Sequence, residues 1–267
     1  MINLLKSELF RVRKRPQGWI MLLMIMLFEV GLYAGLVIAS FVRDDPSSPN
    51  RNIQLDRMWE IGLIPTQVLS GIMLIVFSSS LMGNEFTWNT IRPLIARSPN
   101  RGSLMTAKWF TILIYALILS AIGVLTAVLG SLIGSLLVDI DSGISADRVV
   151  DILATIGRIA LGTLPYSALA FMLAVLSRSN VAGIAIAIAL SFLEDIIFAL
   201  LGLLSDFFDR VANYGIAHNV NVVVLYGGNS DYTSSDLWKS IGICLIYTVV
   251  FLAVALRVFT RRDVTTG

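Results

Sequence analysis

Six apolar segments dominate this sequence, and each is long enough to cross a membrane as a helix. A helix rises about 1.5 Å per residue, so roughly 20 apolar residues span the hydrocarbon core of a bilayer. The composition agrees, because 56% of the residues are hydrophobic, 14% are charged and the mean hydropathy is +0.81. The sequence therefore predicts an all-α integral membrane protein that forms one domain over residues 1–267. The predicted spans are residues 19–42, 61–82, 109–137, 152–176, 181–204 and 237–256.

The charged residues outside these segments are distributed unevenly between the two sides of the membrane. The N-terminus, the connections after the second and fourth spans and the C-terminus hold thirteen of the 20 Lys and Arg residues but only three acids. Because cytoplasmic segments are enriched in Lys and Arg, both termini are predicted to be cytoplasmic. Topology thus accounts for the basic residues, and nucleic acid is not expected as a partner.

The first 15 residues have the periodicity of an amphipathic helix. We expect residues 1–15 to lie in the cytoplasmic interface of the lipid bilayer, held by apolar burial and by anionic lipid. Pro16 and Gly18 are expected to end this helix before the first span. The alternative is a basic segment that only sets the topology. The apolar positions are Ile2, Leu5, Leu9 and Val12, and the charged positions on the other faces are Lys6, Glu8, Arg11, Arg13 and Lys14.

A polar connection, residues 83–108, separates the second and third spans. Pro93 can begin a short helix but cannot lie inside one without loss of a hydrogen bond, so two short helical pieces are predicted on either side of Arg92. Together they would present a small apolar face rimmed by positive charge, suited to docking on another protein. A basic loop that only fixes the topology is the alternative. The residues of this face are Ile91, Leu94, Ile95, Arg92 and Arg97.

Seven residues of this connection resemble a pattern in the permease subunits of type-2 ATP-binding-cassette (ABC) transporters. The basic N-terminal helix, the six spans, the larger external segment before the last span and the closing FTRRDV are also similar to this family. Two positions depart from the pattern, since Asn89 stands where the family usually has glycine and Pro93 falls inside the expected coupling helix. The seven residues are Glu85, Thr90, Arg92, Leu94, Pro99, Arg101 and Lys108.

The resemblance implies an ATP-driven exporter that works by alternating access in a bacterial plasma membrane. Residues 83–108 would form a coupling helix that docks on a separate ATPase subunit, and a second permease copy, identical or related, would complete the transporter. Residues 205–236 would form an extracellular loop with short re-entrant helices, whereas the residues alone fit an amphipathic surface loop equally well. The implied coupling residues are Glu85, Thr90, Arg92, Leu94, Pro99 and Arg101.

No cofactor is expected in this chain itself. The sequence lacks the G-x-x-x-x-G-K-[ST] pattern of a phosphate-binding loop, so ATP and Mg would be bound by the partner ATPase. One cysteine and one histidine leave no cluster with metal-ligand spacing. An enzyme such as an intramembrane protease would need a base beside a serine within the spans, and the sequence offers none. A transport subunit is therefore favoured over an enzyme.

Four charged residues lie within the spans, where charge is costly and often functional. They are Glu29, Arg158, Glu194 and Asp195. By helical rise, Arg158 lies about 9 Å and Glu194 about 15 Å from the outer end of their spans. We therefore expect Arg158 to pair with Glu194 or Asp195, which would lock the fourth and fifth spans or line the substrate path. Glu29 has no partner at matched depth and is predicted to face a polar cavity at a subunit interface.

The same buried acids keep a second transport class open. An ion-coupled secondary transporter would use Glu29, Glu194 or Asp195 as coupling sites. This class explains the buried acids but not a docking loop. Copurification of an ATPase would favour the exporter, whereas proton or sodium dependence of uptake would favour the secondary transporter.

Overall fold

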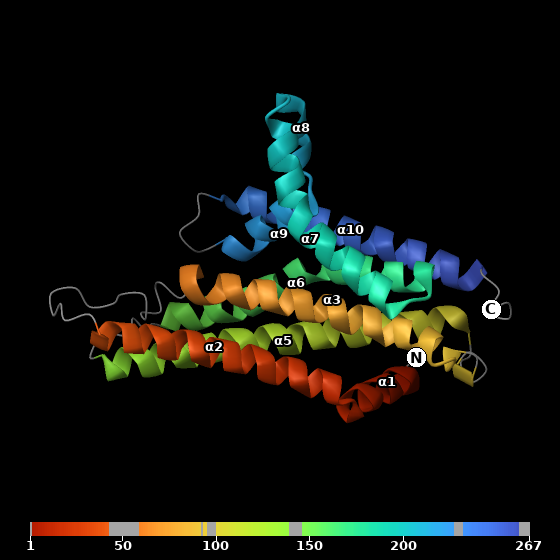
Figure 1. The fold of residues 1–267 in the computed structure, drawn as a ribbon, viewed down its shortest axis with the longest axis horizontal. Coiled ribbons are helices and arrows are strands. Elements are labelled where there is room, and N and C mark those ends of the chain that lie inside the picture. Colours follow the sequence, from red (N-terminus) through yellow and green to blue (C-terminus); the bar gives the residue numbers. More distant parts are fainter. Residues whose placement is uncertain are drawn as a thin grey trace.

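The computed structural model describes residues 2–42, 59–91, 93–94, 100–138, 146–226 and 232–261, and these ranges are helical with no β-strand. A short π-helical turn, η3, precedes the third helix. Figure 1 shows the elements in chain order. They are α1 (Ile2–Lys14), α2 (Pro16–Val42), η3 (Trp59–Leu63), α3 (Ile64–Thr87), α5 (Arg101–Leu137), α6 (Ala146–Ser177), α7 (Asn180–Gly202), α8 (Asp206–Ala212), α9 (Ile216–Leu225) and α10 (Ser234–Arg261).

Six of the described helices are long and apolar enough to cross a membrane, which confirms the six predicted spans. The largest shift of a single boundary is at the start of the third span, because α5 begins at Arg101 in the polar connection. Asn100 caps this helix by accepting a hydrogen bond from the Ser103 N–H at 2.6 Å. The segments are Pro16–Phe41, Ile61–Thr87, Gly102–Leu137, Val149–Ser177, Asn180–Gly202 and Ser234–Arg261.

Apart from α7, the long helices run along the longest axis of the molecule, and the start of α1 and the end of α10 lie at the same end of it (Figure 1). We call this the terminal end. An even number of spans requires the termini to share a side. The distribution of Lys and Arg predicts that this side faces the cytoplasm.

The centre of the bundle is α6, which contacts α3, α5, α7, α9 and α10. Two apolar clusters surround it. One includes Phe77, Leu119 and Phe171, and the other includes Ile75 and Ile159. Because α3 contributes to both clusters, it packs along α6 over most of its length.

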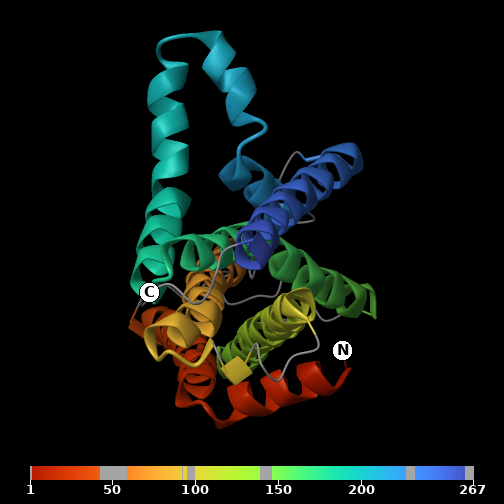
Figure 2. The same cartoon turned by 90° about the vertical axis from the view of Figure 1, so that its right-hand side faces the viewer.

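The C-terminal end of α7 and the whole of α8 stand away from the other helices (Figures 1 and 2). After α8 the chain returns through α9, which packs against α6 and α10. The predicted external segment, residues 205–236, thus contains two short helices, α8 and α9. Their re-entrant character stays a prediction.

The helix break after the N-terminal segment lies at Arg15, between α1 and α2. Pro16 is the first residue of α2, a position where the missing N–H costs no helical hydrogen bond. The expectation that Gly18 also breaks the helix was wrong, since Gly18 lies inside α2. Its carbonyl accepts a hydrogen bond from the Tyr115 hydroxyl of α5 at 2.6 Å, which ties the start of α2 to α5.

Candidate functional site

A fully buried lysine, Lys108 of α5, lies at the terminal end of the bundle. Its ammonium group lies 3.3 Å from Glu85 Oε1 of α3 and 3.4 Å from Glu8 Oε2 of α1. It also donates a hydrogen bond to the Leu81 carbonyl at 3.0 Å. A buried charge is tolerated only when other groups offset its desolvation, and here two carboxylates and a carbonyl do so.

Two arginines extend this arrangement toward the surface. Arg11 lies 2.8 Å from Glu8 and 3.6 Å from Glu85, and Arg15 lies 3.6 Å from Glu85. We call Glu8, Arg11, Arg15, Glu85 and Lys108 the charge cluster. It joins α1, α3 and α5, so these helices are held together by charged groups as well as by apolar packing.

The charge cluster corrects one expectation for the N-terminal helix. Glu8 was placed on an outer, polar face, but it is 1% exposed and contacts Lys108. An apolar periodicity cannot identify an acid that is buried by a lysine a hundred residues away. The available signal was that Glu8 is the one acid in an otherwise basic N-terminal segment.

The end of α3 is closed by a Schellman motif that also holds the first residues of the connection. The Thr90 N–H donates to the Glu85 carbonyl at 3.0 Å, and the Asn89 N–H donates to the Phe86 carbonyl at 3.1 Å. Asn89 has φ 54°, in the left-handed region that favours glycine and tolerates asparagine. This explains how Asn89 can replace the expected glycine. The Thr90 hydroxyl also donates to Glu85 Oε2, which links the connection to the charge cluster.

The structure places the predicted coupling residues in different environments. Glu85 is 2% exposed and is engaged inside the protein, and Leu94 is half-buried against the first apolar cluster together with buried Ile91. Ile91 packs in the core of this chain, so it is not available to the predicted apolar docking face, whereas Arg92, Ile95 and Arg97 of that face lie outside the described residues. Arg101 is the first residue of α5. Arg92 and Pro99 lie outside the described residues, as does part of the two predicted helical pieces.

A second polar contact ties the end of α3 to the start of α7. The Ser79 hydroxyl donates to the Asn180 carbonyl at 2.9 Å, and the Ser80 hydroxyl donates to Asn180 Oδ1 at 3.2 Å. The Asn180 amide in turn donates to Asn84 Oδ1 at 3.1 Å. A Cβ atom on Gly83 would lie 2.5 Å from the Asn180 Cα, so only glycine permits this approach. The end of α3 thus contacts α1, α5 and α7.

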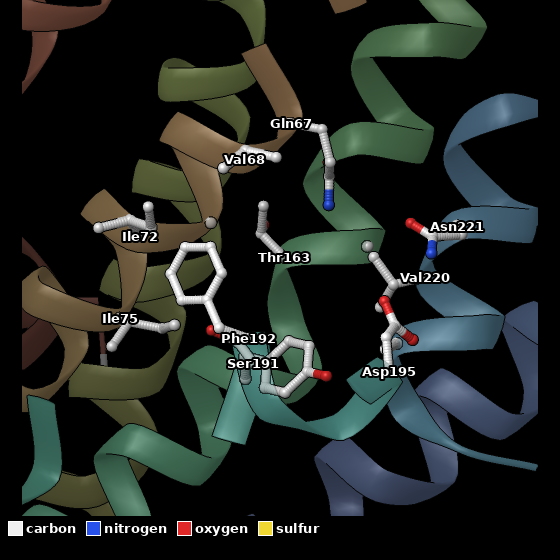
Figure 3. Close-up of a pocket in the computed structure, with 14 residues that line it drawn as sticks. Gln67, Val68, Ile72, Ile75, Thr163, Ser191, Phe192, Asp195, Val220 and Asn221 are labelled. Atoms are coloured by element: carbon white, nitrogen blue, oxygen red, sulfur yellow. The ribbon is translucent and has the colours of Figure 1, made fainter. Parts of the chain in front are cut away.

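A cavity of about 230 Å³ lies between α3, α6, α7 and α9 (Figure 3). Its walls combine aliphatic and aromatic side chains with amides, hydroxyls and one acid. Its lining residues include Gln67, Val68, Ile72, Thr163, Phe192, Asp195 and Asn221. Because α3 runs from this cavity to the charge cluster, the two sites share one helix.

The adjacent acids Glu194 and Asp195 differ in their surroundings. Glu194 accepts hydrogen bonds from the Tyr166 hydroxyl at 2.6 Å and from the Ala217 N–H at 3.3 Å. Ala217 is the second residue of α9, so Glu194 satisfies a free N–H at the positive end of that helix. Asp195 is exposed and, within the described ranges, makes no hydrogen bond or ion pair. Glu194 therefore holds α6, α7 and α9 together, whereas Asp195 is available to a ligand.

The expected ion pair between Arg158 and Glu194 or Asp195 does not form. Arg158 donates instead to the Tyr226 carbonyl and, at 2.8 Å, to the Thr155 hydroxyl. Its guanidinium also lies 5.6 Å from the centre of the Tyr226 ring. A comparison of residue depths along α6 and α7 cannot predict this contact, because the hydrogen-bond acceptor is a backbone carbonyl at the end of α9, which packs beside α6.

Glu29 also differs from its expectation. It was predicted to face a cavity at a subunit interface, but it is fully buried within this chain, where its Oε1 accepts a hydrogen bond from the Thr66 hydroxyl at 2.6 Å. Its Oε2 has no hydrogen-bond partner among the described residues. The hydrogen-bond partner of Glu29 is an uncharged threonine of α3, so a comparison of opposite charges in the sequence could not predict it.

Comparisons with known proteins agree with this architecture. Residues 4–194, which run from α1 through most of α7, match the family described as ABC-2 family transporter protein. Over 208 residues, 74% of this chain, the sequence is 24% identical to the Uncharacterized protein YhcI of Bacillus subtilis (strain 168). That match covers 65% of the relative's own length. The family match spans well over half of the chain and includes the charge cluster, so the chain belongs to the ABC-2 transporter family.

Proposed function

We propose that this chain is the membrane-spanning permease subunit of an ATP-driven exporter, and that a separate ABC-type ATPase drives it. Its family and its six apolar helices make it a multi-pass permease of the plasma membrane. Permeases of this family generally work with an ATPase subunit. The coupling route, the direction of transport and the presence of a second permease copy are the parts that we propose.

The observation that carries the proposal is the position of α3. Gln67, Val68 and Ile72 of this helix line the cavity, and Glu85 near its other end belongs to the charge cluster. A helix transmits tilt or rotation along its length because its backbone hydrogen bonds keep it stiff. A displacement of the charge cluster would therefore move one wall of the cavity.

The connection after α3 supplies the point at which an ATPase would act. The Schellman motif fastens Asn89 and Thr90 to α3, and Ile91 packs in the core, so the first residues of the connection move with the helix. Trp88, at the same turn, is 59% exposed. Arg15 stacks on the Trp88 ring at 5.5 Å, which adds α1 to the moving unit.

These contacts support an alternating-access cycle. When the ATPase subunits close around ATP and Mg, they would displace the connection together with the ends of α1, α3 and α5. The contacts between α3 and Asn180 would carry the same displacement to α7, which forms another wall of the cavity. Two walls of the cavity would then move together relative to α6.

Site-specific photo-crosslinking in native membranes tests the proposal. A photoreactive amino acid placed at Trp88 should capture an ABC-type ATPase, identified by mass spectrometry. The matched control is the same group at Leu136, which is 79% exposed but lies at the opposite end of α5. It should capture no ATPase.

The outcomes separate the two transport classes. If Trp88 captures no ATPase and transport by membrane vesicles requires a proton or sodium gradient but not ATP, the exporter proposal falls. The secondary-transporter alternative, with Glu29, Glu194 and Asp195 as coupling acids, would then be favoured. If Trp88 and Leu136 capture the ATPase equally, the docking site proposed here is wrong.

A further inference from the structure

Among the described residues that line the cavity between α3, α6, α7 and α9, one acidic side chain, Asp195, makes no hydrogen bond or ion pair within the fold. The cavity lining includes no lysine, arginine or histidine among the described residues. The neighbouring Glu194 is occupied by Tyr166 and Ala217. A ligand in this cavity would therefore meet one free negative charge, which favours a cation.

Amides and hydroxyls lie around this acid. Figure 3 shows the Gln67 side chain directed into the cavity from one side, with its amide nitrogen foremost, and Asn221 and Asp195 on another. Gln67 Oε1 is buried and has no hydrogen-bond partner in the described part of the chain. A buried amide oxygen without a partner is costly. A half-turn of the amide about its terminal bond would exchange the nitrogen and Oε1, and a ligand in the cavity that donates a hydrogen bond would then satisfy Oε1.

The remaining wall is apolar, and the cavity opens to the side. Val68, Ile72 and Phe192 lie opposite the polar residues (Figure 3). Val68 is 44% exposed and Phe192 is 52% exposed, and both lie within membrane spans. The opening therefore faces the hydrocarbon region, where an apolar body can enter and a free inorganic ion cannot.

We propose that this cavity binds organic cations with an apolar body, and that a protonated amine is held by Asp195 and Gln67. The apolar body would pack against Ile72 and Phe192 and extend toward the lipid. This inference rests on the proposed permease function and names the class of substrate for it. A purely aliphatic ligand would leave both polar groups without partners, and an anion would be repelled by Asp195.

The probes are three compounds with the same decyl chain. Decylammonium has a charge and N–H donors, decyltrimethylammonium has the charge without donors, and decanol has neither. Binding of each radiolabelled probe to the purified chain in nanodiscs is measured by equilibrium dialysis, with empty nanodiscs subtracted. We expect decylammonium to bind most tightly and decanol least tightly.

Substitutions assign the contacts. Asp195→Asn should weaken decylammonium binding about tenfold and leave decanol unchanged, because only the charge is removed. Gln67→Leu should weaken decylammonium several-fold but not decyltrimethylammonium, which has no proton to donate. The control is Asp151→Asn, an exposed acid of α6 outside the cavity, which should change nothing. Asp195 has no described partner, so Asp195→Asn should keep the thermal stability of the chain.

Each outcome decides the inference independently of the exporter proposal. Unchanged binding in Asp195→Asn, or an equal loss for decanol, overturns it. The same holds if Asp151→Asn matches Asp195→Asn. These measurements need no ATPase. Failure of the Trp88 crosslink together with gradient-driven, ATP-independent transport, but with intact cation binding, would refute only the exporter, and the reverse pattern would refute only the cation site.

Discussion

The Lys108 ammonium on α5 and the Glu85 carboxylate on α3 lie 3.3 Å apart, and their side chains are 0% and 3% exposed. The pair is separated by 23 residues of sequence, which include the whole connection between the two helices. A displacement of that connection that is transmitted to α3 and α5 would therefore move both partners of a buried ion pair. Substitutions in the charge cluster therefore test both the stability of the protein and the coupling between the connection and the helices α3 and α5.

Replacement of Lys108 by methionine should destabilise the protein strongly. Lys108→Met removes the one fully buried cation of the charge cluster and leaves Glu8 and Glu85 with the more exposed Arg11 and Arg15. Loss of one partner of a buried pair costs about 3–5 kcal/mol. Thermal unfolding in detergent, followed by tryptophan fluorescence, measures the loss. The control is Lys6→Met, which removes an exposed lysine of α1 and should change the free energy of unfolding by less than about 0.5 kcal/mol. Equal effects of the two substitutions would mean that Lys108 is not buried as described.

The Schellman motif at the end of α3 makes a conformational prediction for Asn89. Asn89→Gly should keep the stability, whereas Asn89→Ala should lower it by about 1 kcal/mol, because alanine is strained at φ 54°. Differential scanning fluorimetry in detergent compares the three proteins. If alanine is as stable as glycine at this position, the left-handed turn is absent in the membrane protein.

The spans could be read from the sequence because they depend on a local property. A helix in lipid needs only a sufficient run of apolar residues, and all six predicted spans are present. The interfacial helix was predicted for a similar reason, since its periodicity is contained within 15 residues, and α1 is a helix. Its location in the lipid interface stays a prediction.

The polar contacts could not be read in the same way, because they depend on which helices meet. Glu8 finds Lys108 across a hundred residues, and Glu29 finds Thr66 on α3. The predicted partner of Arg158 was wrong because the return of the chain through α9 brings the Tyr226 carbonyl beside it. Opposite charges at matched depth are a weak guide when uncharged groups and backbone carbonyls can satisfy a buried charge.

The hydrogen bond between Tyr166 and Glu194 predicts a structural role for one of the two adjacent acids. Tyr166→Phe removes a donor to the carboxylate and should cost about 1.5–3 kcal/mol, the usual value for a hydrogen bond to a charged group. Thermal unfolding measures the change. Tyr247→Phe is the matched control, because its hydroxyl makes a longer, exposed bond to the Tyr214 carbonyl at 3.1 Å. A larger loss in Tyr247→Phe than in Tyr166→Phe would contradict the role assigned to Glu194.

Glycines at helix contacts give a steric prediction. A Cβ atom on Gly130 of α5 would lie 2.6 Å from the buried Tyr33 ring of α2, whereas a Cβ on Gly31 of α2 would meet nothing within 4 Å. Gly130→Ala should therefore cost about 1–3 kcal/mol through overpacking, and Gly31→Ala should be neutral or stabilising. Both are measured by thermal unfolding in detergent.

A double mutant shows whether the Tyr33 ring is the cause. In a Tyr33→Ala background the obstructing ring is gone, so Gly130→Ala should cost almost nothing, although Tyr33→Ala alone is itself destabilising. The coupling between the two positions should then nearly equal the cost of Gly130→Ala in the parent protein. If Gly130→Ala costs the same in both backgrounds, α2 and α5 do not meet at these residues, and the packing that positions α2 beside the charge cluster would have to be reassigned.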